Sequence, residues 1–269
     1  MLEELNLPKP WDGNLWSYRF QDWKHTMHQH VELELNLITQ GLAIYLLDNE
    51  KYHVRQGDLI WLYPDQNHVL VHETSDFEMW VGVFRPEAMS KLATDPNQQP
   101  LLLSQANGDC CRRLTLKQMQ SLSALMAEVY ATKDQTAHFN SGLGYVFLTC
   151  WQYFENASAI PIEDVHPAVE KAARKIQDEE EATTLNELAR HTGLSPARLS
   201  RLFKEQTGVT MVSFRNRLRL GRFFTVYGTG QRHTMLDAAL AAGFGSYPQF
   251  HRVFKRELGC SPRSHQWRG

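Results

Sequence analysis

Three side chains that could bind a metal ion or a polar ligand lie close together near the N-terminus. His28, His30 and Glu34 are separated by even numbers of residues in the stretch HQHVELELNL. Residues two apart on a β-strand point to the same face, so these side chains can converge. His68 could add a fourth ligand. Because imidazole and carboxylate groups together suit a divalent transition metal, such an ion is our candidate cofactor.

Three interpretations of this cluster remain open. It binds a metal ion, or it hydrogen-bonds a polar effector without one, or the leucines of VELELNL point inward and leave the His and Glu side chains in solvent. Two tryptophans could stack on a sugar ring, although core filling is the more common role of such residues. We expect an effector site at His28, His30, Glu34, His68, Trp61 and Trp80, with the first four as the candidate metal ligands.

A second distinctive group of residues is a set of cations on two repeated segments near the C-terminus. When Ser195 is aligned with Ser246, Arg201 falls on Arg252 and Lys204 on Lys255. Helical spacing places these cations on the face opposite an apolar stripe. From Pro167 onward there are 17 Lys and Arg against nine Asp and Glu, although the whole chain carries a formal charge of −2. A compact basic third suits a polyanion such as DNA.

Each repeat reads as a helix, a tight turn and a second helix. A capping box opens the first helix, a glycine able to take positive φ ends it, and a serine caps the second helix. In the two copies these signals are Thr184 with Glu187 and Thr234 with Asp237, then Gly193 and Gly243, then Ser195 and Ser246. In such a helix-turn-helix, the second helix reads bases while flanking cations hold phosphates.

The elements that must position these groups differ between the two parts of the chain. Residues 16–84 alternate with period two between turn signals, which indicates a β-sandwich or barrel. Residues 114–156 show helical spacing, and the second of the two helices is so apolar that it must be buried on the barrel or against a second subunit. We expect an α+β chain with a jelly-roll sensor barrel (1–110), two packing or dimerisation helices (111–156), a linker (157–166) and an all-helical domain (167–269).

The duplicated helix-turn-helix, which ends in AALAAGFGSYPQFHRVFKRELGCSPRSHQWR, closely resembles the arabinose-regulator (AraC/XylS) family of bacterial transcription factors. The resemblance covers the C-terminal third. It implies a seven-helix unit whose two recognition helices are joined by a long helix near residues 212–227. The positions implied to face bases are Ala197, Ser200, Arg201, Tyr247, Gln249, His251 and Arg252, and we add Lys204 and Lys255 as phosphate contacts. Pro248 departs from the polar residue often found at its position.

The N-terminal strands resemble the cupin-type sensor barrel commonly attached to such DNA-binding units. The stretch HQHVELELNLITQG fits the cupin pattern of His-x-His, three residues, Glu, six residues and Gly, with Gly41 at its end. The stretch GDLIWLYPDQNH supplies a later Gly57, Pro64 and His68. Asp22 stands where the pattern has an early glycine.

These features predict a ligand-responsive, sequence-specific transcription regulator that is not an enzyme. We expect a cytoplasmic homodimer that binds double-stranded DNA and a small effector, such as a sugar, and that contacts RNA polymerase. The N-terminus lacks a secretory signal, no apolar run could span a membrane, and the four cysteines are expected to be reduced thiols. The rivals are a metal-dependent cupin dioxygenase or isomerase with an accessory helical domain, and a non-specific architectural DNA protein.

Overall fold

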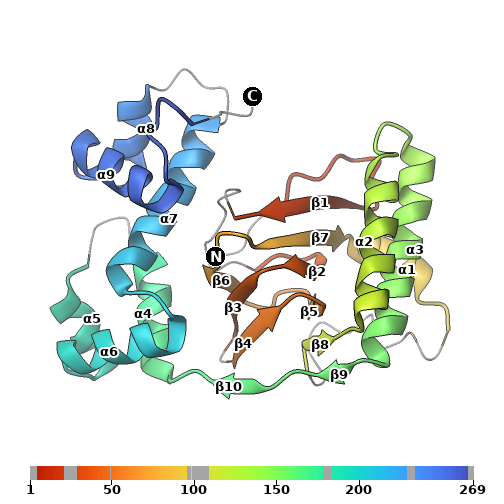
Figure 1. The fold of residues 1–269 in the computed structure, drawn as a ribbon, viewed down its shortest axis with the longest axis horizontal. Coiled ribbons are helices and arrows are strands. Elements are labelled where there is room, and N and C mark those ends of the chain that lie inside the picture. The colour runs from red at the N-terminus through yellow and green to blue at the C-terminus, as the bar shows by residue number, and fades with distance from the viewer. Residues whose placement is uncertain are drawn as a thin grey trace. The chain divides into compact units, whose positions relative to one another are not determined.

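The computed structural model describes residues 5–20, 29–48, 50–95, 98, 109–177, 183–228 and 234–265. Most of the chain up to Asp164 forms one compact unit, and a second unit begins at Val165. Figure 1 shows strands and helices in the first unit and helices in the described residues from Val165 onward. The α+β fold class is therefore confirmed. Among the described residues, no helix combines the length and the apolar character needed to cross a lipid bilayer.

Two β-sheets build the first unit. The six-stranded sheet has the order β1-β7-β2-β5-β8-β9, and the four-stranded sheet has the order β10-β4-β3-β6. The strands are β1 (Gly13–Arg19), β2 (Leu33–Gln40), β3 (Leu42–Leu47), β4 (Glu50–Arg55), β5 (Asp58–Leu62), β6 (His68–Glu73), β7 (Glu78–Phe84), β8 (Cys111–Arg113), β9 (Ser158–Ala159) and β10 (Ile162–Asp164). Side-chain contacts that join β1 and β2 to β6, and β3 to β7, show that the two sheets face each other and that a group of polar side chains lies between them.

The alternating stretch in β2 is buried on both faces. Leu33, Leu35 and Leu37 belong to the core beneath the helices, whereas Glu34 and Asn36 point to the opposite side, into the space between the sheets. The register supports this division because Leu35 lies opposite Trp61, and Glu34 lies opposite Leu62. Successive residues of a strand alternate between faces, so one strand supplies both an apolar core and a polar interior.

Three helices accompany these sheets: α1 (Pro86–Leu92), α2 (Leu116–Tyr130) and α3 (Thr136–Glu155). Helix α2 begins with a capping box between Thr115 and Gln118. The expected burial of α3 is confirmed, and its apolar residues pack on the six-stranded sheet, with Phe147, Trp151 and Phe154 against Trp61. The sheet therefore takes up most of the apolar surface that the sequence assigns to α3.

Residues 157–166, which we expect to link the two parts of the chain, contain two short strands. Strand β9 pairs with β8 in the six-stranded sheet, through Ser158 and Ala159. Strand β10 pairs with β4 in the four-stranded sheet, and Glu163 lies opposite Lys51. The segment therefore passes from one sheet to the other before the second unit begins.

The second unit contains the helices α4 (Pro167–Gln177), α5 (Leu185–Thr192), α6 (Pro196–Thr207), α7 (Met211–Gly228), α8 (Met235–Ala241) and α9 (Tyr247–Leu258). Both capping boxes, both serine caps and the positive φ angles of the two glycines are confirmed. Helix α7 joins the two helix-turn-helix cores, because Phe214 packs on Phe203 and Phe223 packs on Phe250.

The resemblance implied seven helices, whereas the described part of this unit has six. After α9 the chain makes a single turn, in which the N–H groups of Ser264 and His265 donate to the carbonyl of Ser261. The hydroxyl of Ser261 also accepts from the N–H of Ser264. These hydrogen bonds lie within residues 261–265, so the described segment after α9 forms a single turn.

Candidate functional site

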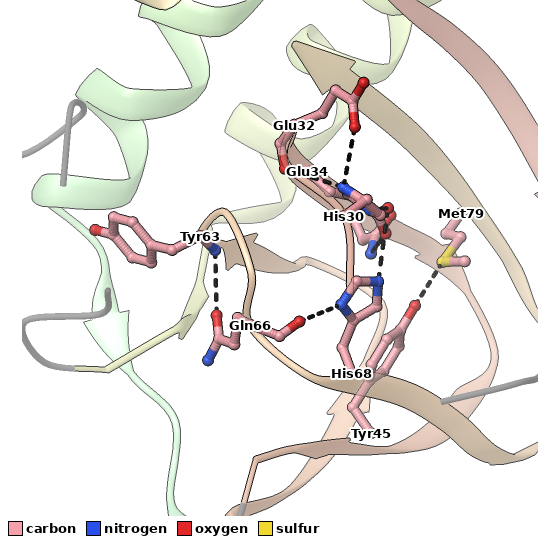
Figure 2. Close-up of polar contacts among 9 residues, drawn as sticks. His30, Glu32, Glu34, Tyr45, Tyr63, Gln66, His68 and Met79 are labelled. Carbon is pink, nitrogen blue, oxygen red and sulfur yellow. Dashed lines mark hydrogen bonds and ion pairs between the residues drawn. The ribbon is translucent and has the colours of Figure 1, made fainter. Parts of the chain in front are cut away.

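Three buried side chains meet between the two sheets of the first unit, and we call His30, Glu34 and His68 the sensor cluster (Figure 2). Glu34 Oε2 lies 3.1 Å from His30 Nε2 and 3.8 Å from His68 Nε2. The two imidazole rings stand edge to face with centroids 5.2 Å apart. The residues are only 2, 8 and 3% exposed, respectively. Their charges therefore interact in surroundings that screen less than water does.

Local backbone contacts bring the three residues of the sensor cluster together. Glu34 lies in β2, His30 just before it, and His68 begins β6. The N–H of Asp65 donates to the carbonyl of His30 at 2.9 Å, which ties the turn before β6 to the segment before β2. Asp65 has a φ of 60°, a conformation that aspartate tolerates better than most residues. The turn in YPDQNH therefore positions His68.

Each histidine is oriented by its second ring nitrogen. His30 Nδ1 lies 3.0 Å from the carbonyl oxygen of Glu32, and His68 Nδ1 lies 2.9 Å from that of Gln66 (Figure 2). A carbonyl oxygen can only accept, so both Nδ1 atoms carry the hydrogen. Burial by itself would lower the pKa of His30, but the hydrogen bond to Glu34 and the negative charges of Glu34 and Glu32 outweigh it and raise this pKa. Both Nε2 atoms face Glu34.

Further polar groups line the same interior. Asn36 donates from Nδ2 to Glu34 Oε1 at 2.7 Å. The Tyr45 hydroxyl donates to Met79 Sδ at 3.3 Å, and its pKa is raised well above the usual value because it is buried and lies near acidic groups. The Tyr18 hydroxyl donates to the buried carboxylate of Glu73. These groups are the kind that can hydrogen-bond a polar molecule, and the sensor cluster combines nitrogen and oxygen atoms that could bind a cation.

The structure places the predicted effector residues in three different situations. It brings together His30, Glu34 and His68, and the interpretation that leaves them in solvent is wrong. His28 lies outside the described residues. Trp61 and Trp80 do not line the interior: Trp61 packs under α3, and Trp80 donates from Nε1 to Ser123 in α2. These two are corrected to core residues, because their positions in β5 and β7 point to the helical face of the sheet.

Sequence reasoning missed four of the polar residues of this interior, namely Tyr18, Asn36, Tyr45 and Glu73. A signal existed for Asn36, which has the same strand parity as Glu34 two residues earlier. The other three come from β1, β3 and β6. Their approach depends on how distant strands pair, and alternation within one strand does not reveal such pairing.

The second unit presents a candidate nucleic-acid interface on α6. Ser195 caps this helix by accepting from the N–H of Arg198, and Leu199 and Phe203 are fully buried. Ala197, Arg201 and Lys204 are exposed, and Ser200 is half-buried. The helix therefore turns one face to its core and presents two cations to solvent.

Helix α9 repeats this arrangement. Phe250 and Phe254 are buried and Val253 nearly so, whereas Arg252 and Lys255 are exposed and Tyr247 and His251 are half-buried. Gln249 also has a structural contact, because its Oε1 accepts the N–H of Gly245 at 2.9 Å and so closes the turn before the helix. Its NH₂ group remains a donor that could reach a base, as predicted.

A polar cluster between two sheets in one unit and two cation-bearing helix-turn-helix motifs in the other are the features of a ligand-responsive, DNA-binding transcription regulator. Comparison with known proteins agrees. Residues 15–147 match the AraC-like ligand binding domain, and residues 188–268 match a helix-turn-helix domain. The chain belongs to the AraC family of transcriptional regulators. Its function is regulation by binding DNA and a small-molecule effector, and the comparisons give no support to the alternative of a cupin enzyme.

Individual relatives are distant but cover most of the chain. The transcriptional activator RhaR of Mannheimia succiniciproducens is 24% identical and covers 90% of this chain and 87% of its own. The arabinose operon regulatory protein of Salmonella typhimurium is 25% identical and covers 85% of this chain and 81% of its own. A crystal structure of ToxT from Vibrio cholerae with a bound unsaturated fatty acid covers 93% of this chain and 92% of its own, at 16% identity and a TM-score of 0.42.

Proposed function

We propose that α6 and α9 are the two recognition helices and that they enter successive major-groove segments of one operator. The observation that carries this proposal is the repeated exposure of an arginine and a lysine opposite a buried stripe. The proposed contacts are Ala197, Ser200, Arg201, Lys204, Tyr247, Gln249, His251, Arg252 and Lys255. Because both helices belong to one chain, a monomer should contact groove segments about 34 Å apart.

We further propose that the effector binds at the sensor cluster. The carboxylate of Glu34, the ring nitrogens of two histidines and the amide of Asn36 suit a small molecule rich in hydroxyl groups. A sugar is our preferred class, since one similar protein is named for an arabinose operon. The effector acts by binding one arrangement of the sensor unit more tightly than another, because equal affinity would shift nothing.

We also propose an oligomeric state, a protein partner and a cellular location. We place a homodimer contact on the outer surfaces of α2 and α3, where Leu116, Tyr130 and Tyr145 remain exposed. Several similar proteins are named activators, which favours a contact with RNA polymerase in the cytoplasm. The proposed boundaries are a sensor barrel (1–110), its helices (111–156), a linker (157–166) and the DNA-binding domain (167–269).

Genome-wide mapping of bound sites tests this function most directly. We expect a small set of sites that share a sequence, and footprinting of one site should show protection of two successive major-groove segments. Effectors suggested by neighbouring genes should then change the affinity for that site. Even protection that ignores sequence would instead identify an architectural DNA protein.

A further inference from the structure

Side chains at equivalent positions attach α6 and α9 to neighbouring helices. When Ser195 is aligned with Ser246, Gln206 falls on Glu257. Each of these two residues lies one position before the last residue of its helix. Each is also bonded to a residue that lies 40 positions earlier in the chain. The same position of the repeat is therefore an attachment point in both copies.

In the first copy, the attachment joins the end of α6 to the start of α4. Gln206 Oε1 accepts the backbone N–H of His166 at 2.9 Å. The ring of His166 caps α4, because its Nδ1 accepts the N–H of Ala168 at 3.1 Å. Helix α4 packs on α5, α6 and α7 and buries Ala168 and Val169 completely or nearly so. Gln206 therefore holds the C-terminal end of α6 to a packed helix that lies outside its own helix-turn-helix.

In the second copy, the attachment joins the end of α9 to α7. Glu257 Oε2 accepts from Arg217 Nε at 3.3 Å, and its Oε1 accepts from Arg256 Nε at 2.9 Å. The side chains of Arg217 and Glu257 are only 14 and 8% exposed, so salt screens this pair less than it would screen a surface pair. Helix α7 precedes the second motif as α4 precedes the first. The two attachments therefore share a layout but differ in chemistry.

Base reading requires that each helix keep a fixed orientation. Arg201 lies five residues before Gln206, about 7.5 Å along the axis of α6. The buried side chains of Leu199 and Phe203 hold one face of the helix, and a bond at its C-terminal end limits tilting about that face. An arginine that bonds O6 and N7 of guanine needs both N–H groups in line, and hydrogen bonds weaken steeply when the angle is lost. Loss of the attachment should therefore reduce base discrimination more than non-specific affinity.

We propose that Gln206 and Glu257 are positioning residues for DNA reading, which set the orientation of α6 against α4 and of α9 against α7. Neither residue is among the proposed DNA contacts, so each acts through its helix. Each should affect only the part of the operator that its own helix reads. This inference rests on the proposed function, because it takes α6 and α9 as the recognition helices.

Operator DNA from the mapped sites, altered in one groove segment at a time, tests the proposal with the full chain. Arg201→Ala and Arg252→Ala show which segment each helix reads, because each should relax base preference in one of them. Gln206→Met removes the acceptor and keeps a side chain of similar length. It should lower discrimination in the α6 segment by about 2- to 10-fold, the contribution of one hydrogen bond, and leave the α9 segment unchanged. Glu257→Met should have the reverse effect.

Two further variants separate positioning from a general loss of structure. Gln206→Glu keeps an acceptor oxygen, as the second copy does, and should restore discrimination although its charge weakens binding to all DNA. His166→Ser keeps the backbone N–H, and serine is a good N-cap, so this variant should discriminate like the wild type. Circular dichroism and thermal unfolding check that each variant folds.

Three results would overturn the proposal. In the first, Gln206→Met discriminates like the wild type in the α6 segment. In the second, it loses discrimination equally in both segments. In the third, Gln206→Glu behaves like Gln206→Met. The Gln206 variants decide the matter even if Glu257→Met does not fold, since they leave the ion pair of α9 in place.

Failure of this inference can be told apart from failure of the proposed function. If neither Arg201→Ala nor Arg252→Ala changes base preference, the assignment of the recognition helices is wrong and the positioning role fails with it. If both arginine variants behave as expected but Gln206→Met keeps full discrimination in the α6 segment, the recognition helices stand and only the positioning role is wrong.

Discussion

Arg201 and Arg252 occupy equivalent exposed positions on α6 and α9, and their planar groups can bond O6 and N7 of a guanine together. We expect Arg201→Ala and Arg252→Ala each to weaken specific binding by about 1–3 kcal/mol and to relax base preference at one position. Lys204→Ala and Lys255→Ala are the matched comparisons. The lysine substitutions should weaken binding to all DNA sequences alike. They should also reduce the slope of log affinity against log salt concentration by about 1. Titration of operator and mutated operator DNA at several salt concentrations measures both effects, and wild-type affinity and preference in both arginine variants would contradict the helix assignment.

The double substitution of His30→Ala with Glu34→Ala tests whether the sensor cluster binds the effector. Removing Glu34 together with His30 avoids leaving the Glu34 carboxylate without its histidine, and only the longer contact of Glu32 with His30 is lost besides. We expect folding and basal operator binding to be largely kept. The response to the effector should be lost. Operator binding with and without effector is the measurement, and a double variant that responds normally would place the effector elsewhere.

Substitutions of Trp61 test whether this residue serves the core or binds the effector. It is fully buried against Phe147, Trp151 and Phe154, so Trp61→Ala should destabilise the sensor unit by about 3–5 kcal/mol. Trp61→Phe should lose less stability than Trp61→Ala and should bind the effector like the wild type. Denaturant unfolding and effector titration give the two quantities. A folded Trp61→Phe variant with strongly reduced effector affinity would argue against the core assignment.

The residues of the site could be foreseen only in part. The even spacing of His30 and Glu34 predicts that they share a strand face. The structure brings the two side chains together, but His30 lies before β2 and a bend at residues 31–32 separates it from the strand, so alternation along one strand is not the cause. The sequence does not reveal on which face of the sheet Trp61 lies. Trp61 and Leu62 are adjacent and point to opposite faces, and only the pairing register of β5 with β2 places Leu62 on the face of Glu34. Gln249 was equally hidden, because its contact with Gly245 depends on the course of the turn.

At the scale of elements, β10 is held to β4 by an ion pair as well as by backbone pairing. Lys51 is buried and bonds Glu163, and this bond lowers the pKa of Glu163. A carboxyl group with a lowered pKa in the folded state stabilises that state above its unfolded pKa, which is near 4.5 here, and stops doing so as the pH falls through the lowered value. Docking of β10 should therefore be complete near pH 6 and should weaken below about pH 4.

Amide hydrogen exchange of Ile162 and Glu163 as a function of pH measures this docking. Glu163→Gln should exchange faster than the wild type at pH 6 and should lose most of the pH dependence. His53→Ala removes the second and more exposed contact of Glu163, and it should raise exchange less than Glu163→Gln does. Equal exchange in Glu163→Gln and the wild type would show that backbone pairing alone holds the strand.

The helices and their limits were the part of the fold most open to prediction. Thr184 with Glu187 and Thr234 with Asp237 begin helices where the sequence indicates, since capping depends on residues three apart. The pairing of Ser158 and Ile162 with strands far away in the sequence was not foreseen. Two- and three-residue strands carry too short an alternation to be recognised, and tertiary pairing alone creates them.

For the whole molecule, the expected state is a dimer through α2 and α3. The sequence predicts this contact from the apolar surface of α3, and the six-stranded sheet covers most of that surface. Tyr145 is still 63% exposed on that helix. We expect Tyr145→Glu to weaken the dimer, whereas Tyr145→Phe, which keeps the apolar area, should not. Sedimentation of both variants at micromolar concentration measures this, and a monomeric wild-type chain would contradict the proposal.

The fragment 161–269 tests the division of labour between the two units. It lacks α2 and α3, so it should be monomeric, and it should still bind operator DNA through α6 and α9. Its affinity should be lower because a dimer engages a second set of contacts at high effective concentration. Sedimentation and operator titration of the fragment give both results, and a fragment that dimerises would move the subunit contact into the helical domain.

Strands β9 and β10 belong to different sheets, yet only Ile160 and Pro161 separate them. Three Cα–Cα steps lead from Ala159 to Ile162 and span at most about 11 Å when fully extended, so the connection between the two sheets is short. The segment therefore acts as a short tether between the two walls of the barrel. A ligand that moved the two sheets apart would have to break the pairing of β9 with β8 or of β10 with β4. The residues after β10, which lead out of the barrel, would be the first to move.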